Sequence, residues 1–287
     1  MRHLQCEFEV SERRACRTVN QHRSVQRREP VVRDENVVLV KRMHALVQQY
    51  PRFGYRRIWS LLRRDGFHVN QKRVYRLWRQ EGLKVRRRQK RKRGRGSSKN
   101  SCHRQRSRGI NDVWAWDFSF NYTRNGTQLK WLSIVDEFTR ECLALKVSRR
   151  MTSEDVIDTL CELFAQRGVP QFIRSDNGPE FVSKAIERWL QQTQVTALYV
   201  QPGSPWENGY AESFISKLRD EFFNVEEFET VRDSRALTRR FQESYNHERP
   251  HSGLNYLTPV EFATSAQTRQ TGAAPSTVTV ASTSAGS

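Results

Sequence analysis

Two carboxylates, Asp176 and Glu180, flank an Asn-Gly pair in the segment "SDNGPEF". An isolated acid at such a place is typical of a turn, because Asp, Asn and Gly readily adopt the backbone angles that turns require. The chemical alternative is a catalytic carboxylate, which needs partners on neighbouring elements. Two other acids qualify: Asp117 in "WAWDFSF" and Glu212 in "ENGYAESF", with 35 residues between Asp176 and Glu212.

Three carboxylates of this kind suit phosphodiester chemistry. Cleavage of a phosphodiester needs a strong nucleophile and relief of the charge that builds on the phosphate, and two Mg²⁺ ions roughly 3.5–4 Å apart supply both. Mg²⁺ prefers oxygen ligands, so Asp and Glu suit it better than His and Cys. Ser216 and Arg219 follow Glu212 at helical spacing, which places a cation for a DNA phosphate on the same helix face.

The composition points to a polyanionic partner. The 287 residues carry a formal net charge of +19, and nucleic acid is the commonest partner of so basic a chain. No stretch approaches 18 uninterrupted apolar residues and the start lacks a signal-peptide core, so a membrane is not expected. The five cysteines are odd in number and lack CxxC spacing. They indicate reduced thiols and a cytoplasmic location.

The amino-terminal third predicts a basic segment, 1–33, followed by a small helical domain, 34–83. Apolar residues recur there at helical spacing in three stretches. Gly66 is expected to end the second helix, and Asn70 and Gly82 to cap and end the third. The short connection between these two helices predicts a helix-turn-helix arrangement. The apolar positions are Leu39, Met43, Leu46, Val47, Ile58, Leu61, Leu62, Val74, Leu77 and Trp78.

Four basic residues on the outer face of the third helix are candidate DNA contacts. They are Lys72, Arg73, Arg76 and Arg79. An ordinary solvated basic face is the alternative, but the total charge favours DNA. The following residues, 84–108, hold thirteen Lys or Arg and no acid. Such a stretch cannot build a core, so it predicts a flexible linker that holds phosphates without reading sequence.

Residues 109–225 predict an α/β domain that contains all three acids. Three successive strands are expected, the first two joined by an Asn-Gly hairpin. A helix then begins with a capping box at Thr152 or Ser153 and ends at Gly168. The order βββ-α-β-α-β-α implies a mixed sheet with flanking helices, and ligands gather at strand ends in such sheets. A helical extension, 226–263, and a disordered tail, 264–287, complete the predicted domains.

Residues 31–263 resemble the OrfB transposases of insertion sequence family 3, which are DDE enzymes of the retroviral integrase superfamily with an RNase H-like catalytic core. The resemblance is carried by "WAWDFSF", "SDNGPEF", "QPGSPWENGYAESFISKLRDE" and "YNHERPHSGLNYLTP". It implies that Asp117, Asp176 and Glu212 are the catalytic, metal-binding triad. The family often carries a basic residue seven positions after the catalytic Glu, and here that residue is Arg219. We count Arg219 and Lys217 as candidate DNA contacts. Glu180 is then expected to be structural or to support the catalytic acids without binding the metal itself.

The resemblance further implies what the protein does and needs. Two Mg²⁺ ions, for which Mn²⁺ can substitute, would serve both cleavage at the ends of an insertion sequence and joining of the freed 3′-OH to another phosphodiester. The expected partners are DNA, as terminal repeats and target, and further copies of the chain on that DNA. The bacterial nucleoid is the expected location. In this family the active enzyme is usually a frameshift fusion with an upstream OrfA frame that carries a leucine zipper. This chain shows no sustained heptads, so we expect it to be the OrfB half alone, with OrfA as a fusion or partner.

Two other functions stay open at this point. One is a helix-turn-helix DNA-binding regulator with a catalytically idle core, and the other is a structure-specific nuclease that cuts but never joins.

Three smaller interpretations concern single motifs. The "HERPH" segment fits a zinc motif only on an unbroken helix, which Pro250 prevents. Asp136 and Glu137 are expected at a surface turn rather than as a fourth ligand, and the aromatic residues around Asp117 are expected in the core, including Phe120.

Overall fold

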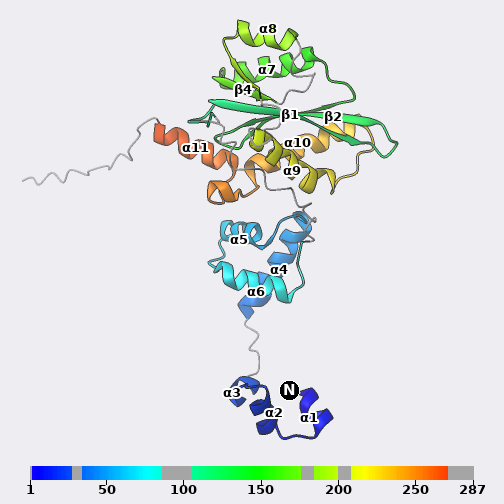
Figure 1. Ribbon diagram of the computed structural model, residues 1–287, viewed down its shortest axis with the longest axis vertical. Helices are drawn as coiled ribbons and strands as arrows, with labels where there is room; N and C mark the ends of the chain where they lie inside the picture. The colour runs from blue at the N-terminus through cyan, green and yellow to red at the C-terminus, as the bar shows by residue number, and fades with distance from the viewer. Residues whose placement is uncertain (1, 28–33, 86–104, 176–183, 200–207, 271–287) are drawn as a thin grey trace, which may run out of the picture. The chain divides into compact units, whose positions relative to one another are not determined.

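The computed structural model describes residues 2–27, 34–85, 105–175, 184–199 and 208–270. The chain divides into two compact units, Met1–Gln49 and Tyr50–Ser287, which Figure 1 draws from blue to red along the sequence. The boundary falls inside the helical region 34–83, so the first helix of that region is grouped with the amino-terminal unit.

Four helices form the described part of the first unit. They are α1 (Arg2–Phe8), α2 (Glu12–Thr18), α3 (Arg23–Gln26) and α4 (Asp34–Gln49). Ser11 caps α2 by accepting a hydrogen bond from the Arg14 amide at 3.4 Å. The apolar stripe predicted for α4 is buried at Leu39, Met43 and Leu46. The basic segment thus forms short helices despite its weak apolar periodicity.

The second unit opens with a pair of helices, α5 (Tyr55–Arg64) and α6 (Gln71–Gln80). The end of α5 and the start of α6 are both as predicted from the sequence. Gly66, at φ 87°, adopts the left-handed conformation that ends α5. The Asn70 side chain accepts a hydrogen bond from the Lys72 amide at 2.8 Å and so caps α6.

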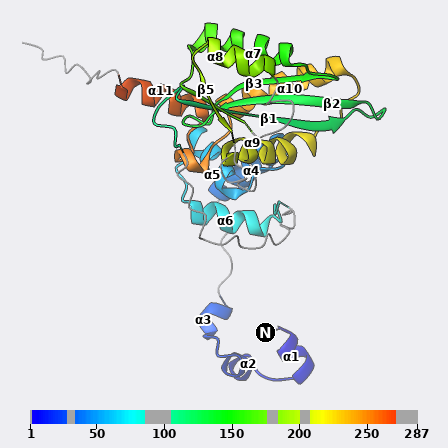
Figure 2. The ribbon, with the colours of Figure 1, turned by 45° about the horizontal axis from the view of Figure 1, so that its top comes forward.

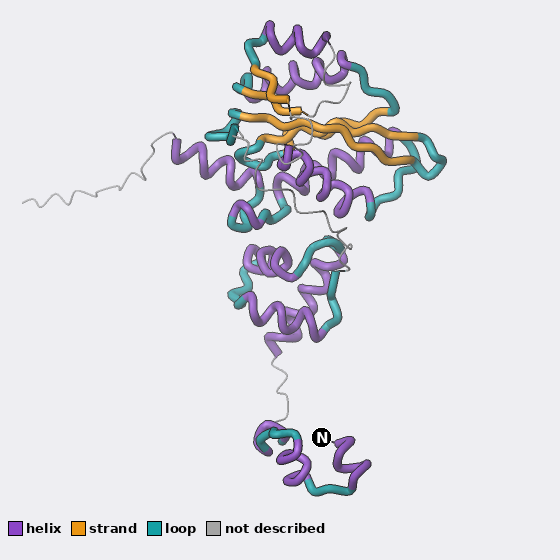
Figure 3. The backbone as a smooth tube through the Cα atoms, viewed as in Figure 1, coloured by secondary structure: helices purple, strands orange, loops and turns teal. Residues whose placement is uncertain are grey.

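A five-stranded mixed sheet in the order β3-β2-β1-β4-β5 forms the centre of the second unit. β1 pairs antiparallel with β2 and parallel with β4, while β3 pairs antiparallel with β2 and β5 parallel with β4. The predicted hairpin joins β1 to β2, with Gly126 at φ 76°. The strands are β1 (Val113–Tyr122), β2 (Gln128–Asp136), β3 (Cys142–Ser148), β4 (Phe172–Ser175) and β5 (Thr196–Tyr199). Figure 3 shows this sheet in orange.

Helices cover both faces of the sheet (Figures 1 and 2). One face carries α7 (Ser153–Arg167) and α8 (Lys184–Gln192). The other carries α9 (Gly209–Leu218), the π-helical turn η2 (Arg219–Phe223) and α10 (Val231–His247). Alternate side chains of β1 enter two separate cores, because successive residues of a strand face opposite ways. Trp114 and Trp116 pack with α7 and α8, whereas Ala115 packs with α9 and α10.

The capping box of α7 uses Thr152. Its hydroxyl accepts from the Asp155 amide, and the Asp155 carboxylate accepts from the Thr152 amide at 2.7 Å. The chain after α7 confirms the expected alternation of strands and helices up to α9. The RNase H-like arrangement predicted from the sequence, a mixed sheet with flanking helices, is therefore the observed one.

The disordered tail was predicted to begin too early. Helix α11 runs Pro259–Gln270, and residues 271–287 lie outside the described part. The helix starts at a second capping box, in which the Thr258 amide donates to Glu261 at 2.7 Å and the Glu261 amide donates to the Thr258 hydroxyl at 3.2 Å. Pro259 at the first helical position strengthens this start. The residues from 264 onward are small and polar, so their composition predicted a disordered tail rather than the second half of α11.

Two bulk expectations can be compared with the described residues. None of the helices in the described ranges is long and apolar enough to cross a membrane. The cysteines within those ranges carry free thiols, and they are Cys6, Cys16, Cys142 and Cys161.

Candidate active site

Asp117 lies in the middle of β1, the central strand, opposite Ser133 of β2. Its side chain is half-buried and accepts a hydrogen bond from the Phe118 amide at 2.7 Å. The Ser133 hydroxyl donates to the Asp117 carbonyl at 3.0 Å. Ala115, two residues earlier, packs under α9, so strand alternation places Asp117 on that same face of the sheet.

Glu212 lies in the first turn of α9 with an exposed side chain. The rotation of α9 is fixed by its buried residues, which face the sheet: Ala211, Phe214, Ile215 and Leu218. A carboxylate near a helix amino terminus is favoured by the helix dipole. Asp117 and Glu212 therefore belong to the same side of the sheet, one on the central strand and one on the helix that covers it.

Asp176 and Glu180 lie outside the residues that the structure describes. Strand β4, which directly precedes Asp176, lies within them. β4 runs parallel to β1 with Arg174 opposite Ala115, and it ends at Ser175. In the sequence, Asp176 comes two residues after Arg174, just as Asp117 comes two residues after Ala115.

The end of β4 is anchored by a buried ion pair that sequence reasoning missed. The Arg174 Nε lies 2.9 Å from Glu137 Oε1, with the two side chains 5% and 0% exposed. The Glu137 amide donates to the Val113 carbonyl at 3.0 Å. The pair thus joins β4 to the end of β2 across β1. No local sequence pattern predicts this ion pair, because Arg174 and Glu137 come together only when the sheet forms.

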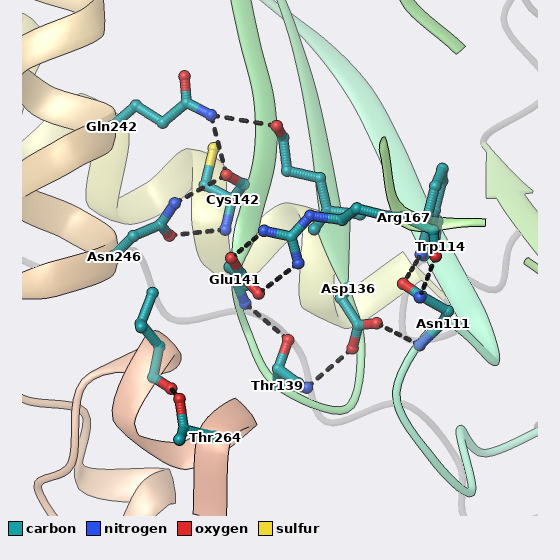
Figure 4. Close-up of polar contacts among 12 residues, drawn as sticks. Asn111, Trp114, Asp136, Thr139, Glu141, Cys142, Arg167, Gln242, Asn246 and Thr264 are labelled. Carbon is teal, nitrogen blue, oxygen red and sulfur yellow. Dashed lines mark hydrogen bonds and ion pairs between the residues drawn. The ribbon is translucent and has the colours of Figure 1, made fainter. Parts of the chain in front are cut away.

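The surface turn predicted at Asp136 and Glu137 is wrong, since both residues are 1% exposed. The Asp136 carboxylate accepts hydrogen bonds from the Asn111, Phe138 and Thr139 amides at 2.7–2.8 Å. Figure 4 shows Asp136 between Asn111 and Thr139. Burial raises the pKa of Asp136, and these amide donors act in the opposite direction. The residue organises the turn after β2.

The same region contains a second carboxylate with a structural role. Arg167 of α7 forms a two-pronged ion pair with Glu141, its Nη1 donating at 2.8 Å (Figure 4). The Asn246 amide group pairs with the Cys142 backbone at 2.9 Å in both directions. These contacts fix β3 to α7 and α10, and so hold the edge of the sheet.

Basic side chains lie along α9 and the turn that follows it. Lys217 donates to the Ser213 hydroxyl at 2.7 Å. Burial, together with the positive charge of the neighbouring Arg249, lowers the pKa of Lys217 to about 8. Arg219 is exposed at the junction of α9 with η2. Glu212, Ser216 and Arg219 are all exposed, as expected for one solvent-facing side of α9.

The predicted basic face of α6 is present. Lys72, Arg76 and Arg79 are exposed and Arg73 is half-buried. Val74, Leu77 and Trp78 are buried on the opposite side of the helix. Tyr75 lies on the basic side, 44% exposed, with its ring 4.7 Å from that of Tyr55. Sequence periodicity did not single out this aromatic residue.

The "HERPH" segment is structural. His247 is exposed at the end of α10, whereas His251 is 5% exposed and its pKa is lowered to about 2 by burial and by Arg249. Arg249, between them, is bound to Glu221. Within the described residues, a range that omits Asp176, no three His, Cys, Asp or Glu side chains come together as a metal site.

The aromatic residues around Asp117 are core with one exception. Trp114, Trp116 and Phe118 are buried, but Phe120 is 47% exposed, so its predicted core position is wrong. The last residues of β1 are poorly covered, since Phe120 and Tyr122 are exposed and Asn121 is half-buried. The ammonium of Lys130 lies 3.8 Å from the centre of the Phe118 ring.

Comparison with known proteins identifies the family. Integrase core domain models match residues 108–205 and 193–259, and an HTH-like domain model matches residues 32–91. The insertion element IS407 uncharacterized 31.7 kDa protein of Burkholderia multivorans is 41% identical, over 93% of this chain and 94% of that protein. The transposase InsD for insertion element IS2D of Escherichia coli is 29% identical, over 80% and 79%. The chain belongs to the transposases of insertion sequence family 3.

One further relative and one solved structure are also similar to this chain. The insertion element IS476 uncharacterized 39.2 kDa protein of Xanthomonas euvesicatoria is 38% identical, over 91% of this chain and 75% of that protein. Among solved structures, the HTLV-2 integrase catalytic core domain in complex with magnesium is 16% identical. It covers 55% of this chain and 99% of that one, with a TM-score of 0.42. The family models and the 41% identical relative confirm the family predicted from the sequence, and the observed mixed sheet with flanking helices confirms the predicted fold class.

Proposed function

We propose that this transposase cleaves DNA at the ends of its insertion sequence and joins the freed 3′-OH to another phosphodiester. The observation that carries the proposal is the placement of Asp117 and Glu212 on one side of the sheet, with the parallel strand β4 ending one residue before Asp176. This arrangement suits three carboxylates that act together on a phosphate.

The donor set fits divalent metal ions. Carboxylate oxygens are the ligands that Mg²⁺ and Mn²⁺ prefer, and three carboxylates can hold two ions if one of them bridges. Bound there, the ions would activate the attacking water or 3′-OH and stabilise the leaving oxygen. Asp117, Asp176 and Glu212 would hold the ions, and no covalent protein–DNA intermediate is needed.

The basic residues supply the DNA contacts in this proposal. Lys72, Arg73, Arg76 and Arg79 on α6 would bind the terminal repeat in a helix-turn-helix domain that spans 34–83. The basic linker, 84–108, would add contacts to phosphates. Arg219 and Lys217 would hold the DNA strand beside Glu212. We further propose that the chain acts in the bacterial cytoplasm as an oligomer on DNA, and that it works with an upstream OrfA frame.

A strand-cleavage and strand-transfer assay tests the proposal. Purified protein is incubated with labelled duplex that carries the terminal repeat, with Mg²⁺ or Mn²⁺ or with EDTA. Nicked and joined products that require metal support the proposal, and they should disappear in Asp176→Asn. Glu226→Gln is the matched control, because Glu226 is an exposed acid outside the site. Nicks without joined products would indicate a nuclease. Binding without nicks, with the upstream OrfA frame fused or added, would indicate a regulator.

A further inference from the structure

The π-helical turn η2 follows directly on α9, the helix that carries Glu212. Such turns are rare and often mark functional sites. Two successive acids of η2, Asp220 and Glu221, contact arginines at the start of the helix-turn-helix pair: Arg52, before α5, and Arg57, within it. The turn therefore joins the proposed catalytic helix to the proposed DNA-binding helices.

Glu221 is the centre of this junction, with a side chain 7% exposed. Arg57 Nη1 donates to its Oε1 at 2.8 Å. Arg249 binds it with two prongs, each at 2.6 Å, and is itself 3% exposed. Burial alone would raise the pKa of Glu221, but Arg249 and Arg57 together lower it, so the carboxylate stays charged. One carboxylate thus holds two segments at once.

Further contacts hold α5 to the carboxyl-terminal part of the same unit. The Tyr50 hydroxyl donates to Glu248 at 2.8 Å, and Arg64 donates to Glu261 at 2.6 Å. The Trp59 ring meets the Tyr256 ring edge-on, with centroids 5.9 Å apart. The segment before α5 and the carboxyl-terminal half of α5 are therefore attached to segments that follow the catalytic helix, and α6 is in turn packed on α5.

We infer that Glu221 is a positioning residue that couples α5 and α6 to α9. It sets the distance between the DNA contacts of α6 and the Glu212 carboxylate, and so determines which phosphodiester enters the site. The inference rests on the proposed function. A buried ion pair is weak evidence of stabilisation, because well-packed apolar residues often stabilise a buried site as well or better, so we assign this cluster a positioning role.

The partly exposed pair at the same junction gives the cleanest test. The Asp220 and Arg52 side chains are 38% and 26% exposed, so reversing either charge leaves the core intact. Arg52→Asp and Asp220→Arg should each lower end cleavage by as much as about 100-fold, the cost of a small misplacement of reacting groups. Their affinity for terminal-repeat DNA and their melting temperatures should stay near those of the unchanged protein. The double variant should recover cleavage.

A second readout separates coupling from structure. Substrates with one to five extra base pairs between the repeat and the cleavage site should be rejected by the unchanged protein but cut by Arg52→Asp and by Glu221→Gln. The inference would be overturned if the variants reject the insertions as the unchanged protein does, or if the cleavage, DNA affinity and melting temperature of Arg52→Asp fall together.

Hydrogen exchange with terminal-repeat DNA covers the case in which the unchanged protein cuts nothing. DNA binding should slow amide exchange in 209–223, and Arg52→Asp should abolish that protection while binding persists. Equal protection in both proteins would overturn the coupling. Absence of cleavage in the unchanged protein, also with the upstream OrfA frame added, would count against the proposed function alone.

Discussion

Arg174 of β4 and Glu137 at the end of β2 form an ion pair whose Nε–Oε1 distance is 2.9 Å, and both side chains are buried. The pair crosses the central strand beside Ala115, two residues before Asp117. The Arg174 guanidinium also donates to the Gln105 carbonyl at 2.6 Å. The strand that leads to Asp176 is thus fixed from both sides by one arginine.

Removing one partner of this pair should destabilise the fold strongly. Arg174→Met leaves the Glu137 carboxylate buried without its counter-charge, which costs about 3–5 kcal/mol of unfolding free energy. Urea denaturation followed by tryptophan fluorescence measures the change. The double variant Arg174→Met with Glu137→Leu should regain most of the loss. A single variant as stable as the unchanged protein would show that the pair is not structural.

The neutral, buried His251 should make the unfolding free energy fall as the pH is lowered. Its pKa is lowered to about 2 by burial and by the cations Arg249, Lys217 and Arg57. Below the ordinary pKa of about 6.5 the unfolded chain binds a proton there and the folded chain does not. The unfolding free energy should therefore fall by about 2 kcal/mol between pH 6.5 and pH 4.5 from this residue alone.

Denaturation curves of His251→Gln across this pH range check that dependence. The variant should lose that part of the acid sensitivity, whereas His247→Gln, at the exposed end of α10, should retain it. An unchanged slope in His251→Gln would mean that His251 is protonated in the fold.

The basic face of α6 should act on DNA through phosphates. Arg76→Ala removes an exposed cation and should lower DNA affinity by a similar factor for all sequences. It should also reduce the slope of log K against log salt by about 1. Fluorescence anisotropy at several salt concentrations measures both quantities. Arg63→Ala, on α5 with its guanidinium over the Trp59 ring, is the matched control and should leave the slope unchanged.

The start of α11 should depend on its capping box. Thr258→Ala removes the hydroxyl that accepts from the Glu261 amide and should cost about 1 kcal/mol. Thr258→Ser retains the acceptor and should cost less. Thermal unfolding of the two variants compares them, and equal losses would mean that the methyl group, not the cap, stabilises this end.

Local signals in the sequence predicted much of this fold. The Asn70 cap, the Thr152–Asp155 capping box and the hairpin glycine at 126 each act within a few residues, so their effect can be read from the sequence. The aromatic character of the segment around Asp117 likewise indicated a core position for Trp114 and Trp116, which is confirmed.

Features that depend on distant segments were not predictable. The helical spacing of 209–223 continues smoothly, so nothing marked the change to a π-helical turn at Arg219. The Glu221 junction joins residues more than 160 positions apart in the sequence. Glu137 was expected at the surface because its partner arrives only with β4. Charged residues in a basic chain are hard to place for this reason, since a buried one depends on a partner far along the chain.

The central claim is that Asp117, Asp176 and Glu212 act together in metal-dependent strand cleavage and transfer. The most direct measurement compares Asp117→Asn, Asp176→Asn and Glu212→Gln with Glu226→Gln on labelled terminal-repeat duplex in Mg²⁺. We predict that each of the three abolishes both nicked and joined products while DNA affinity is retained, and that Glu226→Gln keeps both products. Full activity in any of the three would contradict the account.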